Sequence, residues 1–326
     1  MSNYTNTIAT ITSQVSWREQ NFPLRNRKCR SRFFFHPNPT PKVCLFFHGF
    51  TAAPYQFVPL GKALFASGYN VLIPLQPGHG IAGDWNGDNP PPLPTNIQVY
   101  QDFAREWLET AQNLGEKVII GGLSTGATLT GWLALNTPEI IDRALLFAPY
   151  LSSSLLPLDW LIETLPFYYE WANKDAPGNF GYHGFRIPTL RLFYDLGQQI
   201  LDQAATQAYT QMLIVASERD RVVSRADEKS LFETILQHQP QSWYHCFDSK
   251  FDIHHRMMTE IEGNEYQDLV IALAKAYINS EITWTQLQEI KALLVTKVTF
   301  ANAIATLNLE QKVTPELAQF LASTIN

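Results

Sequence analysis

The sequence predicts an α/β protein whose central sheet is mostly parallel and flanked by helices. Short apolar, β-branched runs that are typical of buried strands alternate with longer segments whose apolar residues have helical spacing. Hydrophobic residues make up 45% of the 326 residues and charged ones 17%, as in an ordinary globular core. The expected strands are 43–47, 69–74, 117–121, 143–148, 211–217 and 242–247, with 32–35 as a further edge strand.

Helical segments separate these strands. They are expected at 56–67, 96–114, 125–136, 224–238 and 265–279. Residues 83–95 interrupt the alternation with a long proline-rich stretch. Loops of that length in compact domains are usually functional, so we expect this one to be more than a connector.

A second interruption spans residues 151–191 and is rich in aromatic residues. It follows the end of a predicted strand, which places it over the mouth of the sheet, where α/β proteins bind ligands. We expect it to be a lid, with Trp160, Tyr168 and Tyr169 lining an apolar acyl pocket. The alternative is a satellite core that only packs on the domain.

The last segment of the chain, 280–326, follows the α/β domain of residues 1–279. Leu287, Ile290 and Leu294 recur there at helical spacing, and Pro315 follows Thr314 as at a helix start. We expect amphipathic helices that dock on the domain, contact a partner or touch a membrane surface. The sequence does not indicate the oligomeric state.

Composition excludes several classes of function. A net charge of −6 and a pI near 5.8 argue against nucleic acid as a partner. The three cysteines indicate neither a disulfide framework nor a zinc site, so a reducing compartment is expected. With no signal-peptide core near the start and no segment of membrane-spanning length, we expect a cytoplasmic protein.

The motif Gly122-Leu-Ser124-Thr-Gly126 directly follows the predicted strand 117–121. A serine between a strand and a helix is held on a tight turn that exposes its hydroxyl above the sheet. Positions two before and two after that serine crowd each other, so both must be glycine. The alternative is a glycine-containing turn with an incidental serine.

A serine becomes a nucleophile when a histidine takes its proton and a carboxylate orients that histidine. In a strand–serine–helix architecture the chain order is serine, acid, histidine. Asp220 follows the next-to-last predicted strand, where the acid belongs; Glu218 competes less well because it still belongs to the strand end. A helix-capping or solvated aspartate is the alternative for Asp220.

Two adjacent histidines, His254 and His255, follow the last predicted strand. Only one of them can face Ser124, and loop geometry favours His255, with His254 as the alternative base. A metal site that combines both imidazoles with Asp248 and Asp252 would need ligands from unrelated directions on a short loop, so we expect no metal.

An acyl-transfer site also needs two N–H donors for the oxyanion. One is the amide of Thr125, which follows Ser124. The other is the amide of Phe50, because the strand 43–47 ends in His48-Gly49 and glycine allows a close approach to substrate. His48 is expected to brace this loop.

Several motifs together resemble bacterial carboxylesterases and monoacylglycerol lipases of the α/β-hydrolase superfamily. The resemblance covers about residues 40–275 and rests on segments in the family's order: Phe46-Phe-His-Gly-Phe50-Thr-Ala, Gly68-Tyr69, Pro77-Gly-His-Gly80, the Ser124 motif and Asp220-Arg-Val-Val. Two positions depart from the family pattern. Ala127 stands where a second glycine is common, and His254 stands where a small residue often precedes the histidine.

The resemblance implies an α/β-hydrolase fold and hydrolysis of small-molecule carboxylic esters, including lipid-like monoacylglycerols, without a cofactor. By position, the triad falls on Ser124, Asp220 and His255, and the oxyanion donors fall on Phe50 and Thr125. An acyltransferase, a thioesterase or a C–C hydrolase would use the same triad, and a non-catalytic binding protein would use the same scaffold.

Overall fold

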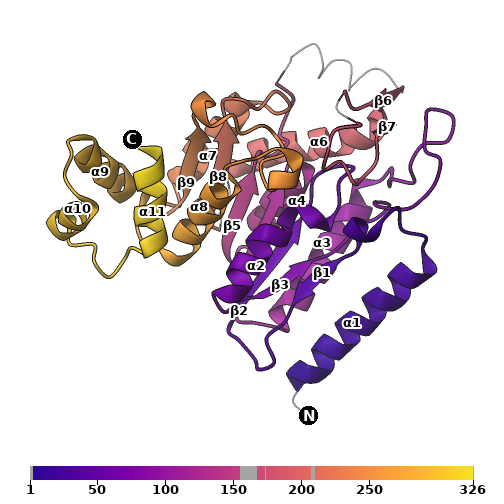
Figure 1. The fold of residues 1–326 in the computed structure, drawn as a ribbon, viewed down its shortest axis with the longest axis horizontal. Coiled ribbons are helices and arrows are strands. Elements are labelled where there is room, and N and C mark those ends of the chain that lie inside the picture. The colour runs from indigo at the N-terminus through magenta and orange to yellow at the C-terminus, as the bar shows by residue number, and fades with distance from the viewer. Residues whose placement is uncertain (1–2, 155–166, 173, 207–209, 326) are drawn as a thin grey trace.

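A sheet forms the centre of the protein, which we describe from a computed structural model covering residues 3–154, 167–172, 174–206 and 210–325 (Figure 1). Within these residues the sheet has seven strands, in the spatial order β1-β3-β2-β4-β5-β8-β9. Only β1 is antiparallel to its neighbour, so the predicted mostly parallel sheet is confirmed. The strands are β1 (Arg32–Phe34), β2 (Lys42–Phe47), β3 (Asn70–Ile73), β4 (Lys117–Leu123), β5 (Ile141–Phe147), β8 (Met212–Ser217) and β9 (Trp243–Phe247).

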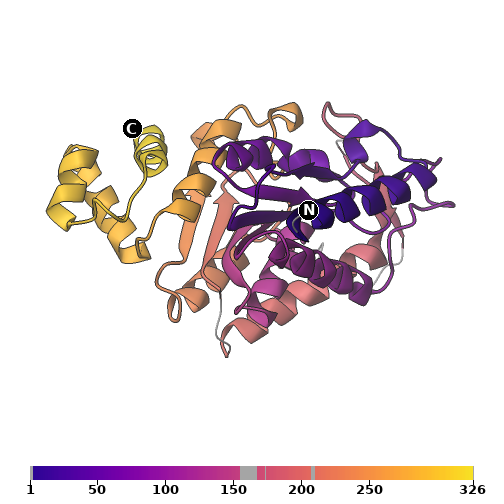
Figure 2. The same cartoon turned by 90° about the horizontal axis from the view of Figure 1, so that it is seen from below.

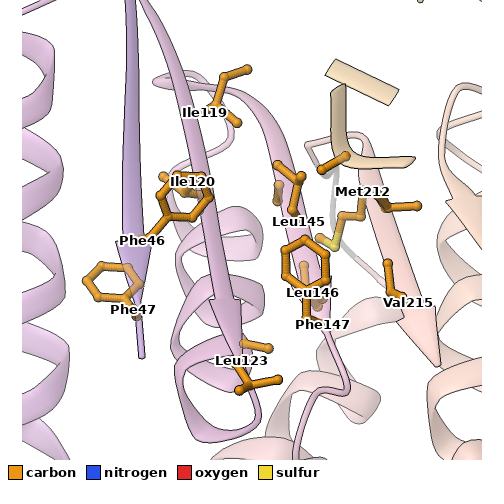
Figure 3. Close-up of a cluster of buried hydrophobic side chains, with 14 of the residues drawn as sticks. Phe46, Phe47, Ile119, Ile120, Leu123, Leu145, Leu146, Phe147, Met212 and Val215 are labelled. Carbon is orange, nitrogen blue, oxygen red and sulfur yellow. The ribbon is translucent and has the colours of Figure 1, made fainter. Parts of the chain in front are cut away.

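The central strands are apolar along nearly their whole length because helices cover both faces of the sheet. Figure 3 shows side chains of β2, β4, β5 and β8 meeting in one cluster. None of the residues labelled there is more than 1% exposed. This buried platform holds the strand ends, and the residues that follow them, at fixed positions along one edge.

Helices form a layer on each side of the sheet, as the view in Figure 2 shows. On one side α2 contacts α8; on the other, α4 contacts α3 and α6, and α6 contacts α7. The helices of the described residues are α1 (Asn3–Asn21), α2 (Val58–Ala66), α3 (Ile97–Gln112), α4 (Thr125–Asn136), α6 (Ile187–Ala204), α7 (Arg225–Leu236), α8 (Gln267–Asn279), α9 (Trp284–Val295), α10 (Phe300–Leu307) and α11 (Pro315–Thr324).

Two of these helices were not predicted. Helix α1 buries Tyr4, Ile11 and Val15, which are so widely spaced that they form a narrow apolar stripe. The Tyr4 hydroxyl donates to Oδ1 of Asn70, which fixes α1 at the β1 end of the sheet. Helix α6 begins inside the stretch that we expected to be a lid, with Pro188 in its first turn.

The remainder of that stretch contains a small antiparallel sheet of β6 (Tyr168–Glu170) and β7 (Gly184–Arg186). Residues 155–166 lie outside the described part of the chain. We call residues 167–172 and 174–186 the hairpin segment.

The helices expected after Asn279 are α9, α10 and α11. Helix α11 packs on α8, where Lys275 Nζ lies 2.8 Å from Glu316 Oε1. Trp284 at the start of α9 contacts the ring of Phe232 on α7. These helices therefore dock on the β9 end of the domain. Across the described residues, every helix is too short or too polar to cross a membrane.

Candidate active site

Ser124 lies on a strained turn between β4 and α4. Its φ is 56° and its ψ is −121°, a backbone conformation that non-glycine residues rarely adopt. A Cβ added at Gly122 would lie 2.2 Å from the carbonyl group of Gly126, and one added at Gly126 would lie 2.2 Å from Phe47 O. The crowding expected from the motif is therefore present, and only glycine fits at both positions.

Asp220 and His255 form a hydrogen bond. His255 Nδ1 lies 2.7 Å from Asp220 Oδ2, and the two side chains are 16% and 1% exposed. The other carboxylate oxygen accepts the amides of Val222 at 2.7 Å and Val223 at 3.3 Å. A carboxylate held in this way can fix the tautomer of an imidazole and stabilise its charged form.

Burial alone would raise the pKa of Asp220. Its contact with His255 and the two backbone amides outweigh burial, so the pKa of this carboxyl lies below its ordinary value. Asp220 is therefore ionised at neutral pH.

The neighbouring candidates point elsewhere. His254 is 63% exposed, and its Nε2 lies 3.5 Å from Asp252 Oδ1. Glu218 accepts the amide of Ser249. Asp252 has a φ of 49°, and this left-handed turn precedes the two histidines. The structure thus pairs Asp220, not Glu218, with His255, not His254.

Ser124, Asp220 and His255 follow β4, β8 and β9, whose carboxyl ends share one edge of the parallel sheet. The chain after β5 links their loops. The amide of Tyr150 donates to Ser124 O at 3.3 Å, and the amide of Ser224 donates to Ser152 O at 3.1 Å. The same segment therefore holds the serine turn and the loop of Asp220.

Two backbone amides beside Ser124 are available to a ligand. Within the described part of the chain, the N–H groups of Phe50 and Thr125 have no hydrogen-bond partner. The two residues are 8% and 1% exposed. They follow the paired strands β2 and β4, whose register runs to Phe47 opposite Gly122. Unpaired, buried N–H donors favour a negatively charged oxygen.

Two buried histidines brace the loop after β2. Nδ1 of His48 lies 3.0 Å from Gly49 O, and its Nε2 accepts the amide of Gln76. Nδ1 of His79 lies 3.0 Å from Pro77 O, and its Nε2 accepts the amide of Thr51. These partners assign the proton to Nδ1 in both rings. Burial lowers the pKa of His48, and it lowers the pKa of His79 to about 4.

The neutral histidines predict acid sensitivity. An unfolded histidine has a pKa near 6.5, so between about pH 6.5 and 4 the unfolded chain binds a proton that folded His79 does not bind. The free energy of unfolding should therefore fall with decreasing pH by about 1.4 kcal/mol per unit for each such histidine. Urea unfolding at several pH values from 7 to 5 measures this slope, and His79→Gln should make it shallower. Identical slopes for both proteins would contradict the assignment.

Thr51 connects this loop to the hairpin segment. Its φ is 60°, which is unusual for a β-branched residue. Its Oγ1 donates to Phe50 O and accepts the indole N–H of Trp171 at 2.8 Å. Thr51 O accepts the amide of Tyr182 at 2.8 Å, and a Cβ added at Gly181 would lie 1.8 Å from the same oxygen. Contacts from two sides therefore fix the residue beside the Phe50 amide.

Aromatic rings from the hairpin segment and α6 surround Phe50. Its ring centroid lies 4.9 Å from that of Phe185 and 5.8 Å from that of Phe193. Phe185 in turn contacts Tyr169 and Trp171. Of the predicted pocket residues, Tyr169 thus belongs to the cluster around Phe50.

The other two predicted pocket residues lie elsewhere or are not described. Tyr168 lies beside Gly87 of the proline-rich stretch and Gly184. Trp160 falls outside the described residues.

A buried carboxyl that sequence reasoning missed ties the loop after β2 to the segment after His255. Glu262 accepts hydrogen bonds from Tyr55, Gln56 and Thr259. Oε1 of Gln56 accepts the amide of Gly49 at 2.8 Å. Because Tyr55 and Gln56 lie more than 200 residues before Glu262 in the chain, no local sequence pattern predicts these contacts.

Known proteins match this chain in sequence. Residues 44–258 match the model of the alpha/beta hydrolase family. A thermostable monoacylglycerol lipase from Bacillus sp. (strain H-257) is 28% identical over 117 residues. The aligned part covers 32% of this chain and 40% of that lipase, so the chain matches less than half of its relative's length.

Solved structures share the fold. One, from work on the metagenome-derived lipolytic enzymes LipS and LipT, has a TM-score of 0.61 at 16% identity and covers 77% of this chain and 98% of its own. A monoacylglycerol lipase from Paleococcus ferrophilus has a TM-score of 0.58 at 16% identity, with coverages of 75% and 95%. A soluble variant of the Saccharomyces cerevisiae monoglyceride lipase has a TM-score of 0.58 at 13% identity, with coverages of 78% and 88%.

Proposed function

Because the chain belongs to the alpha/beta hydrolase family, we propose that it is a serine hydrolase that cleaves carboxylic esters through Ser124, Asp220 and His255. The observation that carries this proposal is the 2.7 Å hydrogen bond between buried Asp220 and His255. It lies at the sheet edge where the strained turn holds Ser124.

In the proposed reaction, Ser124 Oγ attacks the ester carbonyl while Nε2 of His255 takes the hydroxyl proton. Asp220 accepts the Nδ1–H of His255 and stabilises the imidazolium. The amides of Phe50 and Thr125 donate to the oxyanion of the tetrahedral intermediate. His255 then protonates the leaving alcohol, and water hydrolyses the acyl-enzyme by the same route.

We propose a lipid-like acyl ester, such as a monoacylglycerol, as the substrate. The aromatic cluster around Phe50 supports an apolar acyl group, because rings next to the oxyanion donors favour alkyl chains over charged groups. The named monoacylglycerol lipases among the relatives support the same class. Tyr169, which contacts Phe185, belongs to this proposal as a residue along the acyl path.

Product analysis tests this function against its alternatives. The purified full chain is incubated with p-nitrophenyl esters of increasing acyl length, with monoacylglycerols and with an acyl thioester, each with and without a competing alcohol. We expect free acid and alcohol as products, with higher kcat/KM for medium-length acyl esters than for acetate. Acyl transfer to the alcohol as the main reaction would favour an acyltransferase, and preference for the thioester would favour a thioesterase. No turnover of any substrate by folded protein would favour a binding protein.

The contacts of Thr51 predict an effect on rate. Thr51→Val keeps the shape but removes the hydroxyl, and Trp171→Phe removes the indole N–H while it keeps an aromatic ring at this position. Either change should lower kcat about fivefold to tenfold, as expected for one lost hydrogen bond beside the Phe50 amide, with little change in KM.

Matched variants control this prediction. Thr51→Ser keeps the hydroxyl and should retain most of the activity. The double variant Thr51→Val/Trp171→Phe should lose little more than the worse single variant, because both changes break the same contact. Fully additive losses would contradict this coupling.

A further inference from the structure

Basic residues are concentrated near the beginning of the chain. Residues 18–32 contain six of the 24 lysines and arginines but only one of the 30 acidic residues, Glu19. This segment therefore carries a net charge of +5 in a chain whose net charge is −6. Arg18, Arg27, Lys28 and Arg30 are exposed.

Two large aromatic side chains are exposed in the same region. Trp17, in the last turns of α1, is 70% exposed, and Phe22, directly after α1, is 53% exposed. Most aromatic residues of the described chain are instead wholly or partly buried. An exposed indole and an exposed phenyl ring five residues apart require an explanation.

Contacts between the end of α1 and the segment that follows it bring this part of the chain together on one side of the molecule. The amide of Ser31 donates to Glu19 Oε1 at 2.8 Å, which brings the segment around Arg30 against the end of α1. A cleft of about 200 Å³ between α1 and α3 is bordered by Arg18, Phe22 and Ser31. We call Trp17, Arg18, Phe22, Arg27, Lys28 and Arg30 the docking surface.

The docking surface adjoins the hairpin segment. Nη2 of Arg25 lies 3.1 Å from Nε2 of His183, and Nδ2 of Asn26 donates to Phe180 O at 2.8 Å. The Lys28 ammonium lies 5.4 Å from the centroid of the Phe180 ring. In Figure 1, α1 runs from the N-terminus toward the side of the molecule that carries β6 and β7. Whatever binds this surface therefore lies next to the segment that contacts Thr51 and Phe50.

We propose that the docking surface binds the surface of a bilayer that contains anionic lipids. Lysine and arginine side chains are attracted to anionic headgroups, while tryptophan and phenylalanine insert at the boundary between headgroups and acyl chains. Charge alone would suit an acidic protein equally well, but two exposed aromatic rings among the cations favour the bilayer. The binding itself is independent of catalysis; its use, to bring lipid-like esters to Ser124, rests on the proposed function.

Vesicle sedimentation tests the proposal with the full chain. The vesicles contain phosphatidylcholine alone or phosphatidylcholine mixed with phosphatidylglycerol. We expect binding to the anionic vesicles, weakening with added salt, and little binding to the neutral ones. Arg27→Gln/Lys28→Gln/Arg30→Gln and, separately, Trp17→Ser/Phe22→Ser should each weaken anionic binding by about tenfold or more.

The matched control is Val295→Ser/Lys297→Gln. It also removes an exposed apolar residue and a cation, but at the opposite end of the chain, and it should bind like the unaltered protein. All variants should hydrolyse a water-soluble short ester at the unaltered rate, which also shows that they fold.

Absence of binding to anionic vesicles would overturn the proposal, and so would equal binding by the surface variants and the control. A third contrary result would be binding to polyglutamate that is as strong as binding to vesicles and is unaffected by Trp17→Ser/Phe22→Ser. The last result would assign the surface to an acidic protein. Failure of the proposed function is separate, because it would appear as absent ester turnover with vesicle binding retained.

Discussion

Replacing Ser124 with alanine is expected to lower kcat for p-nitrophenyl butyrate by about 10⁵-fold to 10⁶-fold. The reason is that no other hydroxyl is expected to occupy the strained turn where β4 meets α4. The residual rate would come from the amides of Phe50 and Thr125 and from substrate binding. Stopped and continuous absorbance assays of the purified full chain measure the loss.

The control for this prediction is to show that Ser124→Ala folds like the unaltered protein. Alanine removes only the hydroxyl oxygen from a side chain that is 7% exposed, so circular dichroism and the urea midpoint should stay close to those of the unaltered protein. Turnover within about tenfold of the original rate by the folded variant would assign the nucleophile elsewhere.

The second large effect separates the two adjacent histidines. His255→Ala is expected to lower kcat by about 10⁴-fold or more, because it removes the base that Asp220 orients. His254→Ala is the matched control, since it deletes the same ring one residue away from an exposed position, and it should change kcat less than about twofold.

Asp220→Asn completes this set. It keeps the shape of the side chain but cannot hold the imidazole in the same tautomer, so kcat should fall by about 10⁴-fold. If His255→Ala kept its activity and His254→Ala lost it, His254 would be the base. If Asp220→Asn kept the kcat of the unaltered protein, Asp220 would have no role in the mechanism.

The sequence contained enough information for the sheet and the serine turn because both are encoded locally. β-branched runs identify β4 and β5, and local steric crowding requires glycine at Gly122, where a Cβ would meet Gly126. The need for glycine at Gly126 comes instead from Phe47 at the end of β2. The order of the predicted strands along the chain then indicates the two loops in which the acid and the histidine belong.

Other features depend on contacts between distant segments. The pairing of His255, not His254, with Asp220 joins residues that lie 35 positions apart in the chain. The positive φ of Thr51 is stabilised by His79 and Trp171, which lie 28 and 120 residues away. Helix α1 was not predicted because its few buried residues form only a narrow apolar stripe, which gives a weak helical pattern in the sequence.

Active-site labelling tests the central claim most directly. The full chain is treated with a fluorophosphonate, digested and mapped by mass spectrometry. We predict one phosphonate adduct, on Ser124, that is absent from Ser124→Ala and forms much more slowly in His255→Ala than in His254→Ala. An adduct on a different residue, or folded protein that remains unlabelled at Ser124, would contradict the account.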